Sequence, residues 1–224
     1  MRVKLGEYQN HPVNISEESP NEHILLLGTS GSGKSTRLKE IMDDCYVKGR
    51  TVIAFDINGC DFVEARNANV ISALDDGINI NFFNIGNAED YVNQVAYIVE
   101  AFSNIASLGI RQERAFRDAV EFALKNNGEF ANGMEALEAG LRRQSSEVAE
   151  GVLSKFWGLF ESNIFRENKK RIVAGEINVV SIQGVNSTTQ RQVVELVLCE
   201  LWQKCRSREL YEENTTIIID EFQH

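Results

Sequence analysis

Residues 23–41, HILLLGTSGSGKSTRLKEI, place a short apolar run directly before a glycine-rich turn and a helical pattern. The apolar run ends at Gly28, and after four further residues Gly33, Lys34 and Ser35 follow. A buried strand that leads into a glycine-rich loop of this spacing and then into a helix is typical of a phosphate-binding loop. The stretch therefore predicts a strand, the loop and a helix, in that order.

The loop residues suit the binding of a nucleotide triphosphate. Glycines leave room for the backbone to wrap around a phosphate. Amide N–H groups at the start of a helix form a ready anion site. Lys34 would reach the β- and γ-phosphates, and the Ser35 hydroxyl would bind Mg²⁺. The candidate nucleotide-binding residues are Gly28, Thr29, Ser30, Gly31, Ser32, Gly33, Lys34, Ser35 and Thr36. The alternative is a Gly/Ser-rich turn that contains a lysine by chance.

A second candidate element lies at the other end of the sequence. TTIIIDEF, residues 215–222, is an apolar strand pattern that ends in two acids. Asp220 at the end of the strand can hold Mg²⁺ through water. Glu221 can polarise the water that attacks the γ-phosphate, so it joins Lys34 as a predicted catalytic residue. The sequence thus predicts ATP and Mg²⁺ as cofactors, with Ser35 and Asp220 at the metal. Two solvated acids after a core strand are the alternative.

The remaining pattern is that of an α/β fold with a mainly parallel sheet. Predicted strands lie within residues 3–15 (a pair around a turn at 9–11), 51–57, 69–73, 77–85, 171–185 and 215–219, and predicted helices lie within 33–49 and 187–210. Ser187 or Thr188 is the predicted N-cap of the last helix. The stretch 88–168 has helical spacing almost throughout. We expect one domain, 1–224, with 88–168 as a helical insertion or subdomain.

Composition narrows the function classes. The chain has 224 residues, 43% hydrophobic residues and a net charge of −10, so a wide basic face for passive binding to duplex DNA is not implied. None of its four cysteines forms a CxxC pair, which argues against a zinc site. No apolar run approaches the roughly 20 residues that span a bilayer, and no signal peptide is evident. We therefore expect a cytoplasmic protein without a membrane segment.

Four stretches carry a family resemblance. LGEYQNHPVNISEESPNEHILLLGTSGSGKST, VIAFDINGCDF, GEINVVSIQGV and IIIDEFQH together resemble the HerA/FtsK superfamily of DNA-pumping ATPases, which includes the conjugative type IV secretion ATPases. The resemblance implies a RecA-like P-loop core and a hexameric ring that moves DNA, with ATP at each subunit boundary. By matched position, Lys34, Ser35, Asp220 and Glu221 are the ATPase residues. The resemblance also points to Asp56 as an acid near the nucleotide. Alternatively, Asp56 caps the turn at 58–59.

One feature of that family is missing from the sequence. Members continue past the second acidic motif into a strand with a polar sensor residue, which lies between the strands that carry the two motifs. Without it the sheet would have a gap lined by unpaired backbone groups, and each buried one costs about 1–3 kcal/mol. The expectation is a truncated protein, or a slot filled by another strand of this chain or of a neighbour.

Three function classes remain open. The leading one is a DNA-translocating motor ATPase, in which an arginine could reach a neighbouring subunit. Candidate arginines, each of which could equally be a solvated surface residue, are Arg111, Arg114, Arg117, Arg166 and Arg171. The second class is an ATP-binding switch or assembly scaffold with weak hydrolysis. A small-molecule kinase is disfavoured, because a kinase does not need a water-activating Glu221.

Overall fold

The computed structural model of the chain describes residues 2–16, 23–29, 31–65, 67–80, 82–83, 91–206 and 214–220. The chain divides into two compact units. Unit 1 holds residues 1–70, 172–181 and 210–223, and unit 2 holds residues 71–171, 182–209 and 224.

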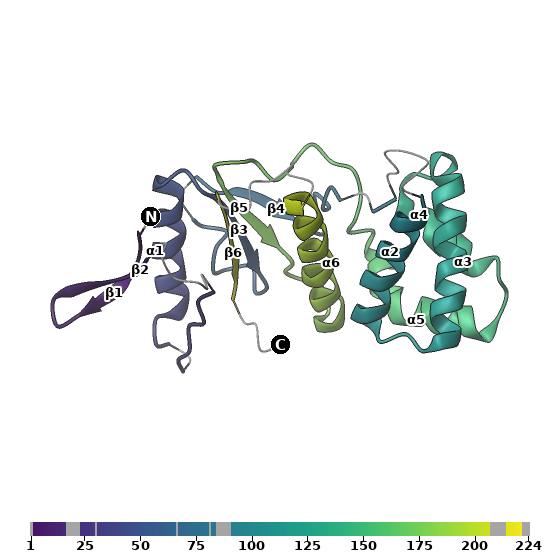
Figure 1. Cartoon of the computed structure of the whole chain (residues 1–224), viewed down its shortest axis with the longest axis horizontal. Helices are drawn as coiled ribbons and strands as arrows, with labels where there is room; N and C mark the ends of the chain where they lie inside the picture. Colours follow the sequence, from purple (N-terminus) through teal and green to yellow (C-terminus); the bar gives the residue numbers. More distant parts are fainter. Residues whose placement is uncertain are drawn as a thin grey trace. The chain divides into compact units, whose positions relative to one another are not determined.

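Unit 1 is built on a parallel sheet and one helix (Figure 1). Its elements are β1 (Arg2–Tyr8), β2 (His11–Ser16), α1 (Lys34–Val47), β3 (Thr51–Asp56), β5 (Ile177–Ser181) and β6 (Thr215–Ile219), and β4 (Asn69–Ser72) runs across its boundary. The strand order is β4-β5-β3-β6, and β3 pairs in parallel with both β5 and β6. Strands β1 and β2 form a separate antiparallel hairpin. The predicted α/β class with a mainly parallel sheet is confirmed.

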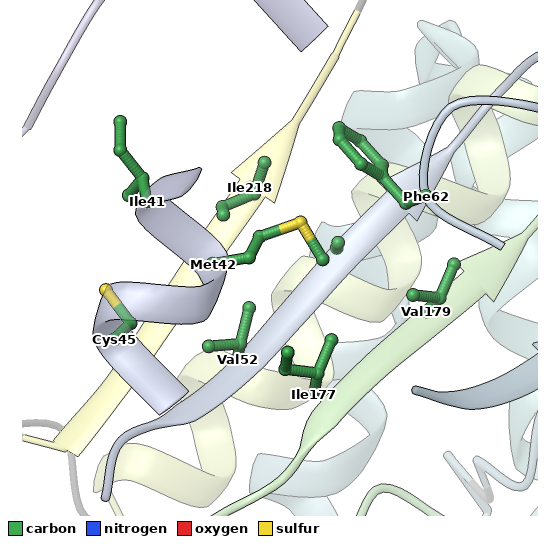
Figure 2. Close-up of a cluster of buried hydrophobic side chains, with 9 residues drawn as sticks. Ile41, Met42, Cys45, Val52, Phe62, Ile177, Val179 and Ile218 are labelled. Atoms are coloured by element: carbon green, nitrogen blue, oxygen red, sulfur yellow. The ribbon is translucent and has the colours of Figure 1, made fainter. Parts of the chain in front are cut away.

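The core of unit 1 fixes α1 against the sheet. Figure 2 shows α1 across the strands β6, β3 and β5, with Met42 directed from the helix toward the sheet. Met42 and Val52 are fully buried, and Ile218 of β6 is 5% exposed. Burial of side chains of this size contributes about 1.5–3 kcal/mol each. This packing holds the first turn of α1 beside the carboxyl end of β6, where both predicted motifs lie.

Residues 23–29 do not form the predicted strand, so that prediction is wrong. Leu25 is 72% exposed and Leu27 is 83% exposed, whereas a buried strand would cover both. In the described sheet β6 is the terminal strand and pairs only with β3, so the intermediate strand that the family resemblance places between the two motifs is not there to pair with the apolar run. A parallel strand needs a neighbour to accept and donate its ladder hydrogen bonds. The apolar run has no such neighbour in the described sheet.

Unit 2 is mainly helical. It contains α2 (Tyr91–Ala106), α3 (Ile110–Asn126), the short 3₁₀ helix η2 (Asn127–Glu129), α4 (Gly133–Arg142), α5 (Glu147–Ser162) and α6 (Ser187–Arg206). Edge-to-face and stacked rings of Phe82, Phe102, Phe116 and Phe156 form its aromatic core. The helices α2 to α5 fall within the predicted insertion at 88–168, although the division into one domain with an insertion stays a prediction. No described helix is long and apolar enough to cross a membrane.

Two further predictions in unit 2 are wrong. Residues 77–80 and 82–83 do not form a strand, and 81, 84 and 85 lie outside the described residues. The Ile78 amide instead donates to the Ile164 carbonyl, and the Ile80 amide donates to the Ile78 carbonyl. The N-cap of α6 is Asn186 and neither Ser187 nor Thr188, because Asn186 Oδ1 accepts from the Thr189 amide at 3.0 Å.

Candidate nucleotide-binding site

The loop before α1 is a tight turn closed by glycines. The Ser32 amide donates to the Thr29 carbonyl at 3.2 Å, and Gly31 and Gly33 have φ values of 76° and 87°. Such left-handed φ values are strained for any residue with a Cβ. Gly33 precedes α1 and supplies no side-chain cap, so the first-turn amides stay directed at the mouth of the loop. An anion placed there would meet several N–H donors at once.

Lys34 lies over this loop. Its Nζ donates to the Gly28 carbonyl at 2.9 Å and to the Thr29 carbonyl at 3.2 Å. A Cβ at Gly28 would meet the Ser32 hydroxyl, so the Ser32 side chain would have to turn away. Carbonyl dipoles are weaker partners for an ammonium than a triphosphate is. The lysine is therefore held at the mouth of the loop, within reach of a bound phosphate.

The two motifs meet at a hydrogen bond between Ser35 and Asp220. Ser35 Oγ donates to Asp220 Oδ2 at 2.7 Å, although the two residues are separated by 185 positions in the sequence. A serine hydroxyl and a carboxylate are the hard oxygen ligands that Mg²⁺ prefers. The pair thus fits a Mg²⁺ ion bound at the start of α1. Glu221 and Ser30, also predicted site residues, lie outside the described residues.

Asp56 organises a turn. It is 1% exposed. Its Oδ1 accepts from the Gly59 amide at 2.7 Å, and its Oδ2 accepts from the Phe62 and Val63 amides at 2.7 and 3.2 Å. Of the two alternatives for this residue, the turn cap is therefore the one observed. A contact between Asp56 and a nucleotide stays a prediction.

A cavity of about 470 Å³ adjoins the loop. Four predicted site residues line it, namely Ser32, Gly33, Lys34 and Thr36. The other lining residues, which the sequence patterns missed, are Leu26, Leu27, Arg37 and Glu40. The phosphate-loop pattern ends at Ser35, so it carries no information about them. Helical spacing places positions 36 and 40 on the same side of a helix, but it does not show that a cavity lies there.

Two of the candidate arginines are engaged within unit 2. Arg117 pairs with Glu113 at 3.2 Å, one turn earlier on α3. Arg166 Nη2 donates to the carbonyls of Leu74 and Asp75 at 2.7 and 2.9 Å. Both guanidinium groups therefore have partners in their own unit. A role for any of the five arginines at a neighbouring subunit stays a prediction.

Comparison with known proteins identifies relatives of this arrangement. The sequence model of the family described as "Helicase HerA, central domain" matches residues 3–201. No curated protein matches the sequence significantly. Among solved structures, VirB4 of Thermoanaerobacter pseudethanolicus matches with a TM-score of 0.71 and 15% sequence identity, over 98% of this chain and 67% of that chain. At this identity the structural match shows a shared fold.

Proposed function

The chain belongs to the family of the helicase HerA central domain, and we propose that it is a motor domain that couples ATP hydrolysis to the movement of DNA. Membership of this family makes it a P-loop ATPase domain. The observation that carries the proposal is the hydrogen bond between Ser35 and Asp220, at 2.7 Å. It joins the helix that follows the phosphate loop to the strand that presents the acid.

Each described site residue has a part in the proposed reaction. The amides of the loop and the Lys34 ammonium hold the β- and γ-phosphates. Ser35 and Asp220 would hold Mg²⁺, which when bound neutralises the charge that develops on those phosphates. Glu221, beyond the described residues, is the proposed base that orients the attacking water. Hydrolysis to ADP and phosphate is then the expected reaction.

DNA and neighbouring subunits are the proposed partners. A net charge of −10 favours contact with DNA through a few loops over contact through a broad basic face. We also propose assembly into a hexameric ring in the cytoplasm, in which an arginine of one subunit completes the site of the next. We further propose that this ring acts in conjugation or in a related DNA-pumping system.

The test is steady-state ATP hydrolysis with and without duplex DNA. Wild-type protein should hydrolyse ATP faster when DNA is present. Both Lys34→Ala and Glu221→Gln should abolish this stimulation, whereas Lys39→Ala, a loss of the same charge on the same helix, should leave it intact. Stimulation that survives Lys34→Ala would contradict the proposed site. Phosphate transfer to an acceptor other than water would identify a kinase.

A second candidate is an ATP-binding switch or scaffold. The described strand order favours it, because β6 is the terminal strand of the four-stranded sheet and residues 23–29 form no strand beside it. Such a protein would bind ATP yet turn it over slowly, and DNA would not change the rate. The same hydrolysis assay, combined with direct measurement of ATP binding, separates the two candidates.

A further inference from the structure

The first two turns of α1 present different chemistry on different sides. Ser35 is directed at Asp220, the metal side of the candidate site. Thr36, Arg37 and Glu40 line the cavity of about 470 Å³. Because successive residues of an α-helix are about 100° apart, Arg37 lies roughly 200° around the helix from Ser35. The helix thus separates a metal side from a cavity side, with the phosphate loop between them.

This separation gives a bound nucleotide a direction. Ser35 and Asp220 would hold Mg²⁺, which would neutralise charge on the terminal phosphates, so the γ-phosphate end of a bound nucleotide would lie toward these two residues. The amides around Gly33 and the Lys34 ammonium would hold the phosphate nearest the loop, and Lys34 also lines the cavity. A triphosphate is a linear chain. Its α-phosphate, ribose and base therefore extend from the loop toward the cavity that contains Arg37 and Glu40.

The cavity side carries groups that suit a ribose. Arg37 Nη1 donates to Glu40 Oε2, one turn along the helix. The Arg37 side chain is 38% exposed and that of Glu40 is 55% exposed, so the carboxylate still has acceptor capacity toward the cavity. A carboxylate accepts strongly from hydroxyl groups such as the two on a ribose ring. The leucines at positions 26 and 27 provide an apolar wall beside it.

We propose that Glu40 accepts a hydrogen bond from the ribose hydroxyls of the bound nucleotide and that Arg37 is a positioning residue that holds the Glu40 carboxylate in place. The pair then selects a ribonucleoside triphosphate over its 2′-deoxy counterpart. This inference rests on the proposed ATP site, and it adds the sugar-recognising residues to it.

The test is equilibrium binding of ATP, 2′-deoxyATP and inorganic tripolyphosphate to the full chain in the presence of Mg²⁺, measured by titration calorimetry. Wild-type protein should bind ATP about tenfold or more tightly than 2′-deoxyATP, the range expected for one hydrogen bond to a charged group. In Glu40→Ala this preference should disappear, while tripolyphosphate affinity stays unchanged. Asp43→Ala removes an equal charge from the same helix outside the cavity and should keep the preference. In Arg37→Ala the preference should shrink without vanishing.

The possible failures are distinguishable. Equal affinity of the wild type for ATP and 2′-deoxyATP overturns the inference and leaves the ATP site standing. The inference is also overturned if Glu40→Ala still prefers ATP to 2′-deoxyATP as strongly as the wild type does. The same holds if Glu40→Ala loses affinity for tripolyphosphate along with affinity for ATP. Absence of binding for all three ligands overturns the proposed function itself, and the inference with it. Thermal unfolding of each variant confirms that it is folded; the Glu40 side chain is more than half exposed, so its removal should leave the fold intact.

Discussion

Replacement of Asp56 by asparagine should open the turn that follows β3. The carboxylate accepts three backbone N–H bonds with two oxygens. An amide keeps one of these oxygens and turns an NH₂ group toward the remaining donors. In the better orientation the Gly59 amide is left facing another donor, while the Phe62 and Val63 amides keep an uncharged acceptor.

The expected cost follows from this count. One hydrogen bond to a charged group is lost, at about 1.5–3 kcal/mol, and two are weakened, so the turn should lose about 2–4 kcal/mol. Asp56 is 1% exposed, so water cannot readily replace the lost acceptor. Because 1.4 kcal/mol corresponds to a factor of ten, local opening should become roughly 30-fold more frequent or greater. That is a large share of the 5–15 kcal/mol typical of a domain.

Hydrogen exchange followed by mass spectrometry measures this opening directly. Amides of β3 and of residues 59–63 should exchange faster in Asp56→Asn than in wild type. Asp61→Asn, which removes the same charge in the same turn, is the matched control and should leave exchange unchanged. Wild-type exchange rates in Asp56→Asn would refute the turn role and leave the carboxylate available to a nucleotide.

Two further predictions concern unit 2. A Cβ at Gly133 would lie 2.6 Å from Cγ of Phe83, which is 3% exposed, so Gly133→Ala should overpack the core by about 1–3 kcal/mol. Fluorescence of Trp157 during thermal unfolding should show a lowered midpoint, and an unchanged one would contradict the packing. Asp76 has a lowered pKa because Lys170 donates to it at 2.7 Å. The stability from this pair is therefore present above the ordinary Asp pKa of about 3.9 and is lost as the pH falls through the folded-state pKa. In Lys170→Ala the acid-induced loss of stability, measured by urea unfolding at a series of pH values, should be smaller, and an identical pH profile would contradict the pairing.

The sequence pattern predicted a helix or strand correctly where the residues that determine it lie within the element itself. The apolar spacing of α1 and its loop, and the apolar run of β3, predicted these elements correctly. The meeting of Ser35 with Asp220 was also predictable, because one metal site requires both chemical groups and the carboxyl ends of parallel strands lie at one edge of the sheet. The same reasoning could not reach residues that enter a site through shape alone. Arg37 and Glu40 are of this kind.

The failed predictions share a physical cause, namely dependence on partners distant in the sequence. Residues 23–28 have the composition of a buried strand whether or not a neighbouring strand is present, so composition could not show that β6 would end the sheet. The apolar residues in 77–80 are packed, and the Ile78 amide donates to the Ile164 carbonyl; within the described part of the chain no second strand pairs with them. The N-cap of α6 is Asn186, one residue before the predicted Ser187, because several neighbouring polar side chains could serve as the N-cap.

The central claim is that the phosphate loop and the acid at the end of β6 hold one Mg²⁺–nucleotide together. The most direct measurement is ATP affinity as a function of Mg²⁺ concentration, for wild type and for Asp220→Asn. The arrangement around Ser35 predicts that Mg²⁺ tightens ATP binding to the wild type and has much less effect on the variant, whose loop amides and Lys34 still hold the phosphates. An equal response to Mg²⁺ in both proteins would show that Asp220 takes no part in the site.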